Sequence, residues 1–264
     1  MRTILITGAS RGLGAALAKA YAAPNVRLFL TARRAEALRD VANNCREKGA
    51  EVLCFELDLL SEASIDGLLA AVERAGWPDM AFANAGVYSG RRHNGNLEPW
   101  PEQYQQLVVN LVGTIRLMDA LASQMKRRGS GHLLLVSSLA ALQPQPDSPA
   151  YSASKAGIAV WSRAMAEDLA SFGVKVGVIY PGHIESEQTA IHVGALPGIL
   201  PAEKAAKLIQ KQVARGKHRI IFPRHIHWLI IASNLLPGWL RRRANRPFRY
   251  HVRGAGEAEK ENRS

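Results

Sequence analysis

The chain has 264 residues, of which 47% are hydrophobic, a formal net charge of +12 and two cysteines. This length is enough to bury a core without disulfides or structural metals, and it suits a single α/β domain. The sequence contains no apolar run of 18 residues, which argues against a transmembrane helix. Cys45 and Cys54 show no metal-ligand spacing, so the composition excludes a disulfide scaffold and favours a reduced, cytoplasmic protein.

Strands and helices are predicted to alternate along the chain. The segment RTILIT has too few aliphatic residues for the core of a signal peptide and predicts a first strand. Further strands are predicted at VRLFL, EVLCFEL, DMAFA, HLLLVSS, VKVGVIY and RIIF. Helices are predicted from Leu13 onward and over residues 35–48, 61–75, 101–127, 151–172 and 201–215. The predicted strands are continuously apolar, as in a parallel sheet that is covered on both faces.

Repeated strand–helix units predict a doubly wound parallel sheet, an α/β Rossmann fold with helices on both faces. We expect one such domain over residues 1–222. Residues 223–264 form an apolar and basic C-terminal extension, of which about the last ten residues are expected to be disordered.

The turn after the first predicted strand reads TGASRGLG and contains Gly8, Gly12 and Gly14. Glycines at a strand-to-helix junction allow a tight turn and a close approach of the backbone to a diphosphate. The N-terminus of the following helix adds free N–H groups and a positive dipole. An ordinary glycine-rich loop is the alternative, but the position after the first strand favours a dinucleotide site.

Several motifs occur in the order found in short-chain dehydrogenases/reductases. These are TGASRGLG, NAG at 84–86, Asn110 within a long helix, the serine pair at 137–138, YSASK at 151–155 and PG at 181–182. Over about residues 2–186 the chain therefore resembles this family, which implies a nicotinamide-dependent oxidoreductase. Ala83 and Ser186 depart mildly from the family pattern, which often has Asn and Thr at these places.

The resemblance implies a catalytic set of Asn110, Ser138, Tyr151 and Lys155. Tyr151 and Lys155 are one helical turn apart and would project from the same face. Tyr151 would exchange a proton with the substrate oxygen, and Ser138 would hydrogen-bond that oxygen. Lys155, together with the positive nicotinamide of the oxidised cofactor, would lower the pKa of Tyr151 from near 10 toward 7, which takes about 4 kcal/mol, and Lys155 would also hold the nicotinamide ribose. Asn110 would hold a water between Lys155 and solvent.

The residues after the second predicted strand favour NADP(H) as the cofactor. A ribose 2′-hydroxyl is usually bound by an acid there, whereas a 2′-phosphate needs a cation. The chain has no acid at this place but has Arg33 and Arg34, and Arg11 in the glycine-rich turn lies toward the same region. We assign the contact to Arg33 and regard Arg34 as a solvated residue at a helix start.

The family resemblance gives the remaining cofactor residues. The full set is Gly8, Ser10, Arg11, Gly12, Leu13, Gly14, Arg33, Asp58, Leu59, Asn84, Ala85, Gly86, Tyr151, Lys155, Pro181, Gly182, Ile184 and Ser186. No metal site is expected, because His183, His192, His225 and His227 have no convergent carboxylate or cysteine.

The predicted function is hydride transfer between NADP(H) and a carbonyl or secondary alcohol of an apolar, possibly lipid or acyl, small molecule. The segment after Gly182 is rich in aliphatic residues and poor in Lys and Arg, and QPQPDSPA before Tyr151 is expected to border the substrate. A cofactor-sensing protein that has lost catalysis is the alternative, but the complete catalytic set argues against it. Family members usually pair through the helices at 101–127 and 151–172, which implies a homodimer or homotetramer.

The positive charge lies mainly at the C-terminus. Residues 201–264 carry fifteen Lys or Arg and four Asp or Glu, a net charge of +11, and the first 200 residues carry only +1. The neutral body and the lack of a nucleic-acid motif argue against nucleic-acid binding. In the extension an apolar segment over residues 228–240 precedes a run of arginines. Two interpretations stay open: a peripheral anchor at the cytoplasmic face of an anionic membrane, or packing on the substrate lid or a neighbouring subunit.

Overall fold

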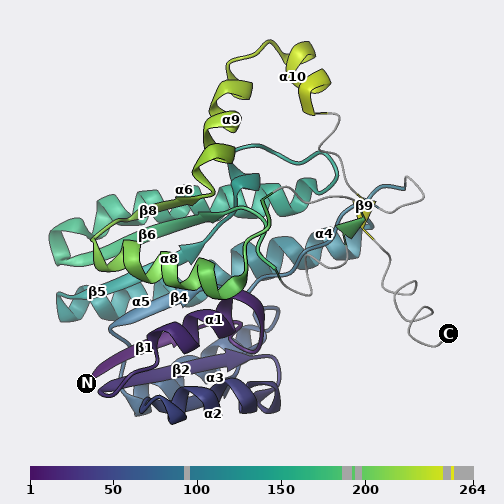
Figure 1. The fold of residues 1–264 in the computed structure, drawn as a ribbon. Coiled ribbons are helices and arrows are strands. Elements are labelled where there is room, and N and C mark those ends of the chain that lie inside the picture. The colour runs from purple at the N-terminus through teal and green to yellow at the C-terminus, as the bar shows by residue number, and fades with distance from the viewer. Residues whose placement is uncertain (92–95, 186–191, 194–197, 246–250, 253–264) are drawn as a thin grey trace.

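The computed structural model describes residues 1–91, 96–185, 192–193, 198–245 and 251–252 (Figure 1). The strands are β1 (Arg2–Ile6), β2 (Val26–Ala32), β3 (Glu51–Glu56), β4 (Met80–Ala83), β5 (Gly131–Val136), β6 (Val174–Pro181), β7 (His192–Val193), β8 (Arg219–Phe222) and β9 (His251–Val252). The helices are α1 (Gly12–Tyr21), α2 (Arg39–Glu47), α3 (Glu62–Ala75), α4 (Trp100–Leu107), α5 (Thr114–Arg128), α6 (Pro149–Leu169), α8 (Ala202–Ala214), α9 (Arg224–Asn234) and α10 (Gly238–Asn245). Short 3-10 turns are η1 (Ala35–Leu38), η3 (Leu139–Ala141) and η4 (Ala170–Phe172), and η2 (Val108–Gly113) is a π-helical turn.

The predicted doubly wound sheet is confirmed. Seven of the described strands pair in the order β3-β2-β1-β4-β5-β6-β8, and each neighbouring pair is parallel. The chain runs outward from β1 to β3 and then crosses back to β4 on the other side of β1. Such a reversal leaves a crevice at the carboxyl ends of β1 and β4, where open α/β sheets bind ligands.

Alternate residues of each strand supply two apolar layers. Ile4 and Ile6 of β1 pack in a cluster with α1, α2 and α8, whereas Leu5 packs in a second cluster with α3, α5 and α6. Successive side chains of a strand point to opposite faces, so the continuously apolar strands bury both faces of the sheet (Figure 1). The core therefore fixes the strand ends from which the site is built.

Three helices differ from the predicted form, and the one predicted over 151–172 ends as α6 followed by the 3-10 turn η4. The segment 35–48 begins as the 3-10 turn η1 before α2, and the long helix 101–127 is interrupted by η2 between α4 and α5. Within this run the hydroxyl of Thr114 donates to the carbonyl of Val109, at 2.8 Å. Gly113 packs closely against the loop after β3, where an added Cβ would be 2.2 Å from the carbonyl oxygen of Leu59. Such π-helical turns often occur at functional sites, and η2 contains Asn110.

The C-terminal extension contains helices α9 and α10, which project beyond the end of the sheet (Figure 1). No residue of α9 is fully buried. Among the described residues, no helix is long and apolar enough to cross a membrane. A domain boundary at residues 222–223 stays a proposal, and the predicted disorder of the last residues falls outside the described part of the chain.

Candidate active site

A cavity of about 1180 Å³ opens at the carboxyl ends of the parallel strands. Its walls come from the turns that follow β1, β2, β3, β4, β5 and β6, and from α6 and α9. It extends from Arg33 and Asp58 at one end to Tyr151 and the α9 side chains at the other. This elongated shape suits a dinucleotide with a substrate beyond its reactive end.

The glycine-rich turn forms one wall of this cavity and fits a diphosphate. Gly8 has φ +65°, and an added Cβ would be 2.8 Å from the Cα of Ala85. Gly14 lies under the turn, where a Cβ would be 2.1 Å from the carbonyl oxygen of Gly8. Helix α1 begins immediately afterwards, with no acidic residue in its first turn and no capping side-chain bond from Arg11. The first N–H groups of α1 can therefore bind an anion.

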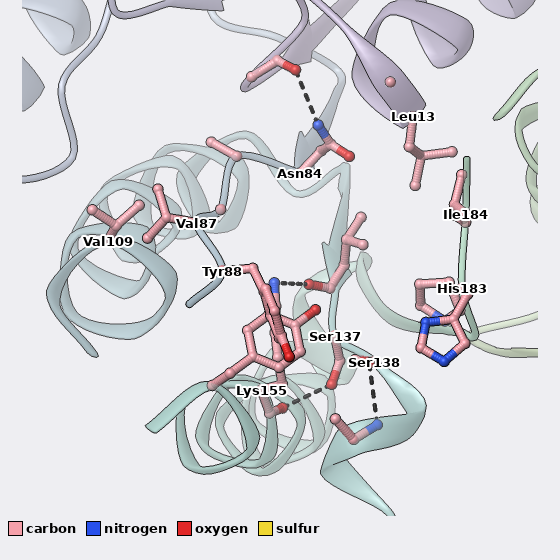
Figure 2. Close-up of a pocket in the computed structure, with 18 of the residues that line it drawn as sticks. Leu13, Asn84, Val87, Tyr88, Val109, Ser137, Ser138, Lys155, His183 and Ile184 are labelled. Atoms are coloured by element: carbon pink, nitrogen blue, oxygen red, sulfur yellow. Dashed lines mark hydrogen bonds between the residues drawn. The ribbon is translucent and has the colours of Figure 1, made fainter. Parts of the chain in front are cut away.

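Thr7 and Asn84 tie this turn to the loop after β4. The Thr7 hydroxyl accepts the backbone N–H groups of Asn84 and Ala85, at 3.0 and 2.9 Å. The side-chain amide of Asn84 donates to the carbonyl of Thr7 at 2.9 Å and to that of Gly8 at 3.2 Å, and Figure 2 shows Asn84 in the cavity wall. The two loops that would hold the cofactor thus form one hydrogen-bonded unit. Thr7 is a structural member of the site that the sequence analysis missed, although it lies beside the first glycine of the turn.

Helix α6 carries Tyr151 and Lys155 on one face, as their spacing predicts. Lys155 is only 5% exposed, and its Nζ donates to the carbonyl of Val136 at 3.0 Å. The hydroxyl of Ser137 donates to the carbonyl of Lys155 at 2.7 Å, so the end of β5 is bonded to α6 twice (Figure 2). The Lys155 ammonium is 5.7 Å from the centre of the Tyr151 ring. These contacts hold Lys155 and its helix against the end of β5.

The pKa values of this pair correct one expectation. Burial lowers the pKa of Lys155 to about 8. Burial also raises the pKa of Tyr151, and a hydrogen bond with Ser138 opposes that rise. For the protein chain itself the pKa of Tyr151 is therefore raised and not lowered toward 7, because loss of solvation of the phenolate is the largest influence. The lowering that the positive nicotinamide would add stays a prediction. At neutral pH Tyr151 is a protonated phenol.

Ser138 and Tyr88 surround the Tyr151 hydroxyl region. The Ser138 hydroxyl accepts the N–H of Ala140 at 3.1 Å, which fixes it at the start of η3. The Tyr88 ring packs edge-on against the Tyr151 ring, with centroids 4.9 Å apart and an angle of 78°. Tyr88 was not predicted, although it follows the NAG motif by two positions. It lines the cavity (Figure 2).

Asn110 lies behind the cavity wall. It is 1% exposed, its Oδ1 accepts the N–H of Val87, and its Nδ2 donates to the carbonyl of Val87, both at 2.8 Å. Its Nδ2 also lies 3.3 Å from the hydroxyl of Ser154 on α6. Asn110 therefore positions the loop that carries Val87 and Tyr88. Its predicted role in holding a water stays a prediction.

Most predicted cofactor residues line the cavity. They are Gly8, Ser10, Arg11, Gly12, Leu13, Arg33, Asp58, Leu59, Asn84, Ala85, Gly86, Tyr151, Lys155, Pro181, Gly182 and Ile184. Gly14 supports the turn from below, and Ser186 lies outside the described residues. The predicted border segment contributes Gln143–Asp147 to the wall. Sequence reasoning missed the wall formed by α9, which includes Ile226, Leu229 and Ile230. In the described part of the chain, no group of three or more His, Cys, Asp or Glu residues could hold a metal ion.

A dinucleotide cradle that leads to a half-buried tyrosine and a buried lysine defines an oxidoreductase that binds a nicotinamide cofactor. The family model described as short chain dehydrogenase matches residues 2–193, and the chain belongs to this family.

Three comparisons illustrate the relationship. An uncharacterized oxidoreductase of Myxococcus xanthus is 36% identical over 223 residues, covering 84% of this chain and 87% of the relative. A fatty acyl-CoA reductase of Mycobacterium tuberculosis is 30% identical over 243 residues, covering 90% and 82%. A solved metagenomic short-chain oxidoreductase in complex with NADP is 32% identical, with a TM-score of 0.68 and coverage of 80% and 89%.

Proposed function

We propose that this protein is an NADP(H)-dependent reductase of apolar carbonyl compounds, with lipid or acyl compounds as the substrate class. The observation that carries the proposal is the set of Ser138, Tyr151 and Lys155 at the inner end of a cavity whose outer part fits a dinucleotide. The reverse reaction, oxidation of a secondary alcohol, uses the same residues.

The protonation state of Tyr151 favours carbonyl reduction. When bound, the reduced nicotinamide supplies a hydride to the carbonyl carbon. Tyr151 has a raised pKa and can give its proton to the substrate oxygen as that oxygen gains negative charge. Ser138 donates a hydrogen bond to the same oxygen. Lys155 places a positive charge beside the phenolate that remains.

Arg33 supports the choice of NADP(H). The family match leaves the choice between NAD(H) and NADP(H) open. Arg33 and Arg34 are exposed at the rim of the cavity, and neither forms an ion pair with another described residue. The acid at the end of β3, Glu56, instead accepts the backbone N–H of Ala35 at 3.3 Å. A guanidinium without a carboxylate partner is suited to a 2′-phosphate. A ribose 2′-hydroxyl would instead need a carboxylate acceptor at this place.

The walls near Tyr151 support an apolar substrate. Val87, Leu139, Pro144, Ile226 and Leu229 line this part of the cavity. Few charged groups accompany them, and a fatty acyl-CoA reductase is among the relatives. We place the enzyme in the cytoplasm as a homodimer or homotetramer.

The direct test is NADPH consumption by the purified protein with ketones, aldehydes, 3-ketoacyl compounds and acyl-CoA thioesters. Each class is offered in short and long chain lengths, and loss of NADPH absorbance is measured beside direct titration of NADPH binding. Turnover that increases with chain length supports the proposal. Tight NADPH binding without turnover of any carbonyl would contradict it and would favour a cofactor-sensing protein instead.

A further inference from the structure

The α9–α10 pair presents an apolar face to solvent. Trp228 is 62% exposed, Leu229 64%, Leu235 83% and Trp239 65%, and Ile231 is also exposed. Large apolar side chains that gather in this way mark an interaction surface. We call this set of five residues the outer face.

The opposite side of α9 attaches the helix to the fold. Ile226 and Ile230 pack against the cluster that includes Leu139 and Tyr180. The Ser233 hydroxyl lies 3.4 Å from Oε1 of Gln143, and the Asn234 side chain donates to the carbonyl of Leu142 at 3.2 Å. The helix is therefore held beside the substrate end of the cavity, where α9 and α10 project beyond the sheet (Figure 1).

The charge around the outer face indicates its partner. Between Pro223 and Glu257 the sequence contains seven arginines and no Lys, Asp or Glu. Within the two helices, Arg224, Arg241 and Arg243 flank the apolar residues. A second copy of this surface would bring like charges together, whereas an anionic lipid surface would attract them.

The lengths of the helices indicate how they would meet a membrane. Helix α9 has 11 residues and α10 has 8, well below the roughly 20 residues that span a bilayer. An apolar face with tryptophans and neighbouring arginines suits a helix that lies in the plane of the lipid headgroups.

The outer face is continuous with the cavity. Leu229 belongs to the outer face and also lines the cavity. Ile226 and Ile230, which lie beside it on α9 but outside the outer face, line the cavity as well. We propose that the outer face docks on an anionic lipid bilayer and that an apolar substrate reaches Tyr151 from the bilayer along α9. Docking on the bilayer does not depend on the proposed reductase function, whereas entry of the substrate from the bilayer rests on it.

Docking is tested by sedimentation of the full-length protein with vesicles of phosphatidylglycerol and phosphatidylcholine, compared with pure phosphatidylcholine. The anionic vesicles should bind the protein, and high salt should weaken the binding. Trp228→Glu combined with Leu235→Glu should weaken it by about thirtyfold or more, because both apolar anchors are lost. Arg241→Gln combined with Arg243→Gln should weaken it by about tenfold to thirtyfold.

Leu97→Glu is the matched control, since Leu97 is 73% exposed and lies just before α4, outside α9 and α10. This control should bind anionic vesicles like the native protein. Failure of the native protein to bind at low salt overturns the proposal, as does an equal loss of binding in Leu97→Glu. The oligomeric state of the double variant Trp228→Glu with Leu235→Glu is also measured by light scattering without lipid. If the double variant loses an oligomer that the native protein forms, docking on lipid is overturned, because the outer face would then bind a second copy.

Entry from the bilayer is tested with a substrate identified in the carbonyl panel. Turnover of a long-chain carbonyl embedded in anionic vesicles should fall at least tenfold in Trp228→Glu with Leu235→Glu. Turnover of a short, water-soluble carbonyl should not change, because neither residue lines the cavity. Equal loss with both substrates contradicts entry from the bilayer. Vesicle binding is measured without turnover, so failure of the reductase function and failure of docking are distinguishable.

Discussion

Burial shifts the pKa of Tyr151 and that of Lys155 in opposite directions. Each shift disfavours the charged form, so the phenol stays protonated and the ammonium loses its proton more easily. The spacing of the two residues predicted their common face, since the period of a helix is local. Their pKa directions could not be predicted, because they depend on packing against β5 and its Val136 carbonyl, which is distant in the sequence.

Lys155 should give carbonyl reduction an alkaline limit. Its pKa is lowered to about 8, so its charge is present below that pH and lost above it. Tyr151 has a raised pKa and should remain protonated throughout this range. We expect kcat/KM for reduction to be level below about pH 7 and to fall roughly tenfold for each pH unit well above 8. Ser138→Ala should keep this profile at a lower rate, since serine does not titrate. A level profile through pH 9.5 would contradict the role of the Lys155 charge.

Arg33 should determine the cofactor preference. Arg33→Ala should weaken NADPH binding by about tenfold to a hundredfold, because a charge-assisted contact of about 1.5–3 kcal/mol is lost. NADH binding should change little. Fluorescence titration of both cofactors measures this, with Arg39→Ala as control, because Arg39 is exposed nearby but does not line the cavity. Equal affinity of the native protein for the two cofactors would show that the arginine argument is wrong.

At the level of elements, the glycine-rich turn and η2 differ in how well sequence predicts them. The turn was predictable because Gly8, Gly12 and Gly14 follow an aliphatic run directly. The π-helical turn was not, because residues 108–113 contain no helix breaker except the terminal Gly113. Its cause is tertiary: Gly113 packs on the Leu59 backbone, and Asn110 is bonded to the loop after β4. The apolar segment over residues 228–240 was apparent in the sequence, but helix α9 and its position beside the cavity required the three-dimensional structure.

Gly14→Ala should disrupt the cofactor cradle. The added methyl group would overlap the Gly8 carbonyl oxygen, at 2.1 Å, and the Asn84 amide, at 2.6 Å. The backbone must shift, so we expect a loss of about 1–3 kcal/mol in the free energy of unfolding and much weaker NADPH binding. Gly67→Ala in α3 is the control, since nothing lies within 4 Å of its added Cβ. It should raise stability by up to about 1 kcal/mol. Similar denaturation midpoints for the two variants would contradict this account of the turn.

The whole molecule divides its charge and its apolar surface between two regions. The first 200 residues carry a net charge of +1, whereas residues 201–264, which include α8 and β8 as well as the extension, carry +11. Composition alone revealed this division. Composition could not decide whether the apolar residues of the extension pack on the fold or face solvent. In the structure, one side of α9 packs on the fold and its other side is exposed.

The exposed surface of α6 and η2 bears on quaternary structure. Val160 on α6 is 57% exposed and Val112 in η2 is 58% exposed. We expect light scattering at micromolar concentration to give at least twice the 28.8 kDa of the chain. Val160→Glu should reduce this mass while NADPH binding is retained, because Val160 does not line the cavity. A monomeric native protein would refute the predicted oligomer.

The most direct test of the proposed reductase is Tyr151→Phe, measured for both turnover and NADPH binding. The substitution removes only the phenolic oxygen, so the fold and NADPH affinity should be nearly unchanged while kcat falls by about a hundredfold to ten-thousandfold. Ser138→Ala should lower kcat by about a hundredfold or more, through loss of a hydrogen bond to the substrate oxygen. If Tyr151→Phe binds NADPH normally and still reduces the carbonyl at a rate close to that of the native protein, Tyr151 is not the proton donor and the assignment of the site is contradicted.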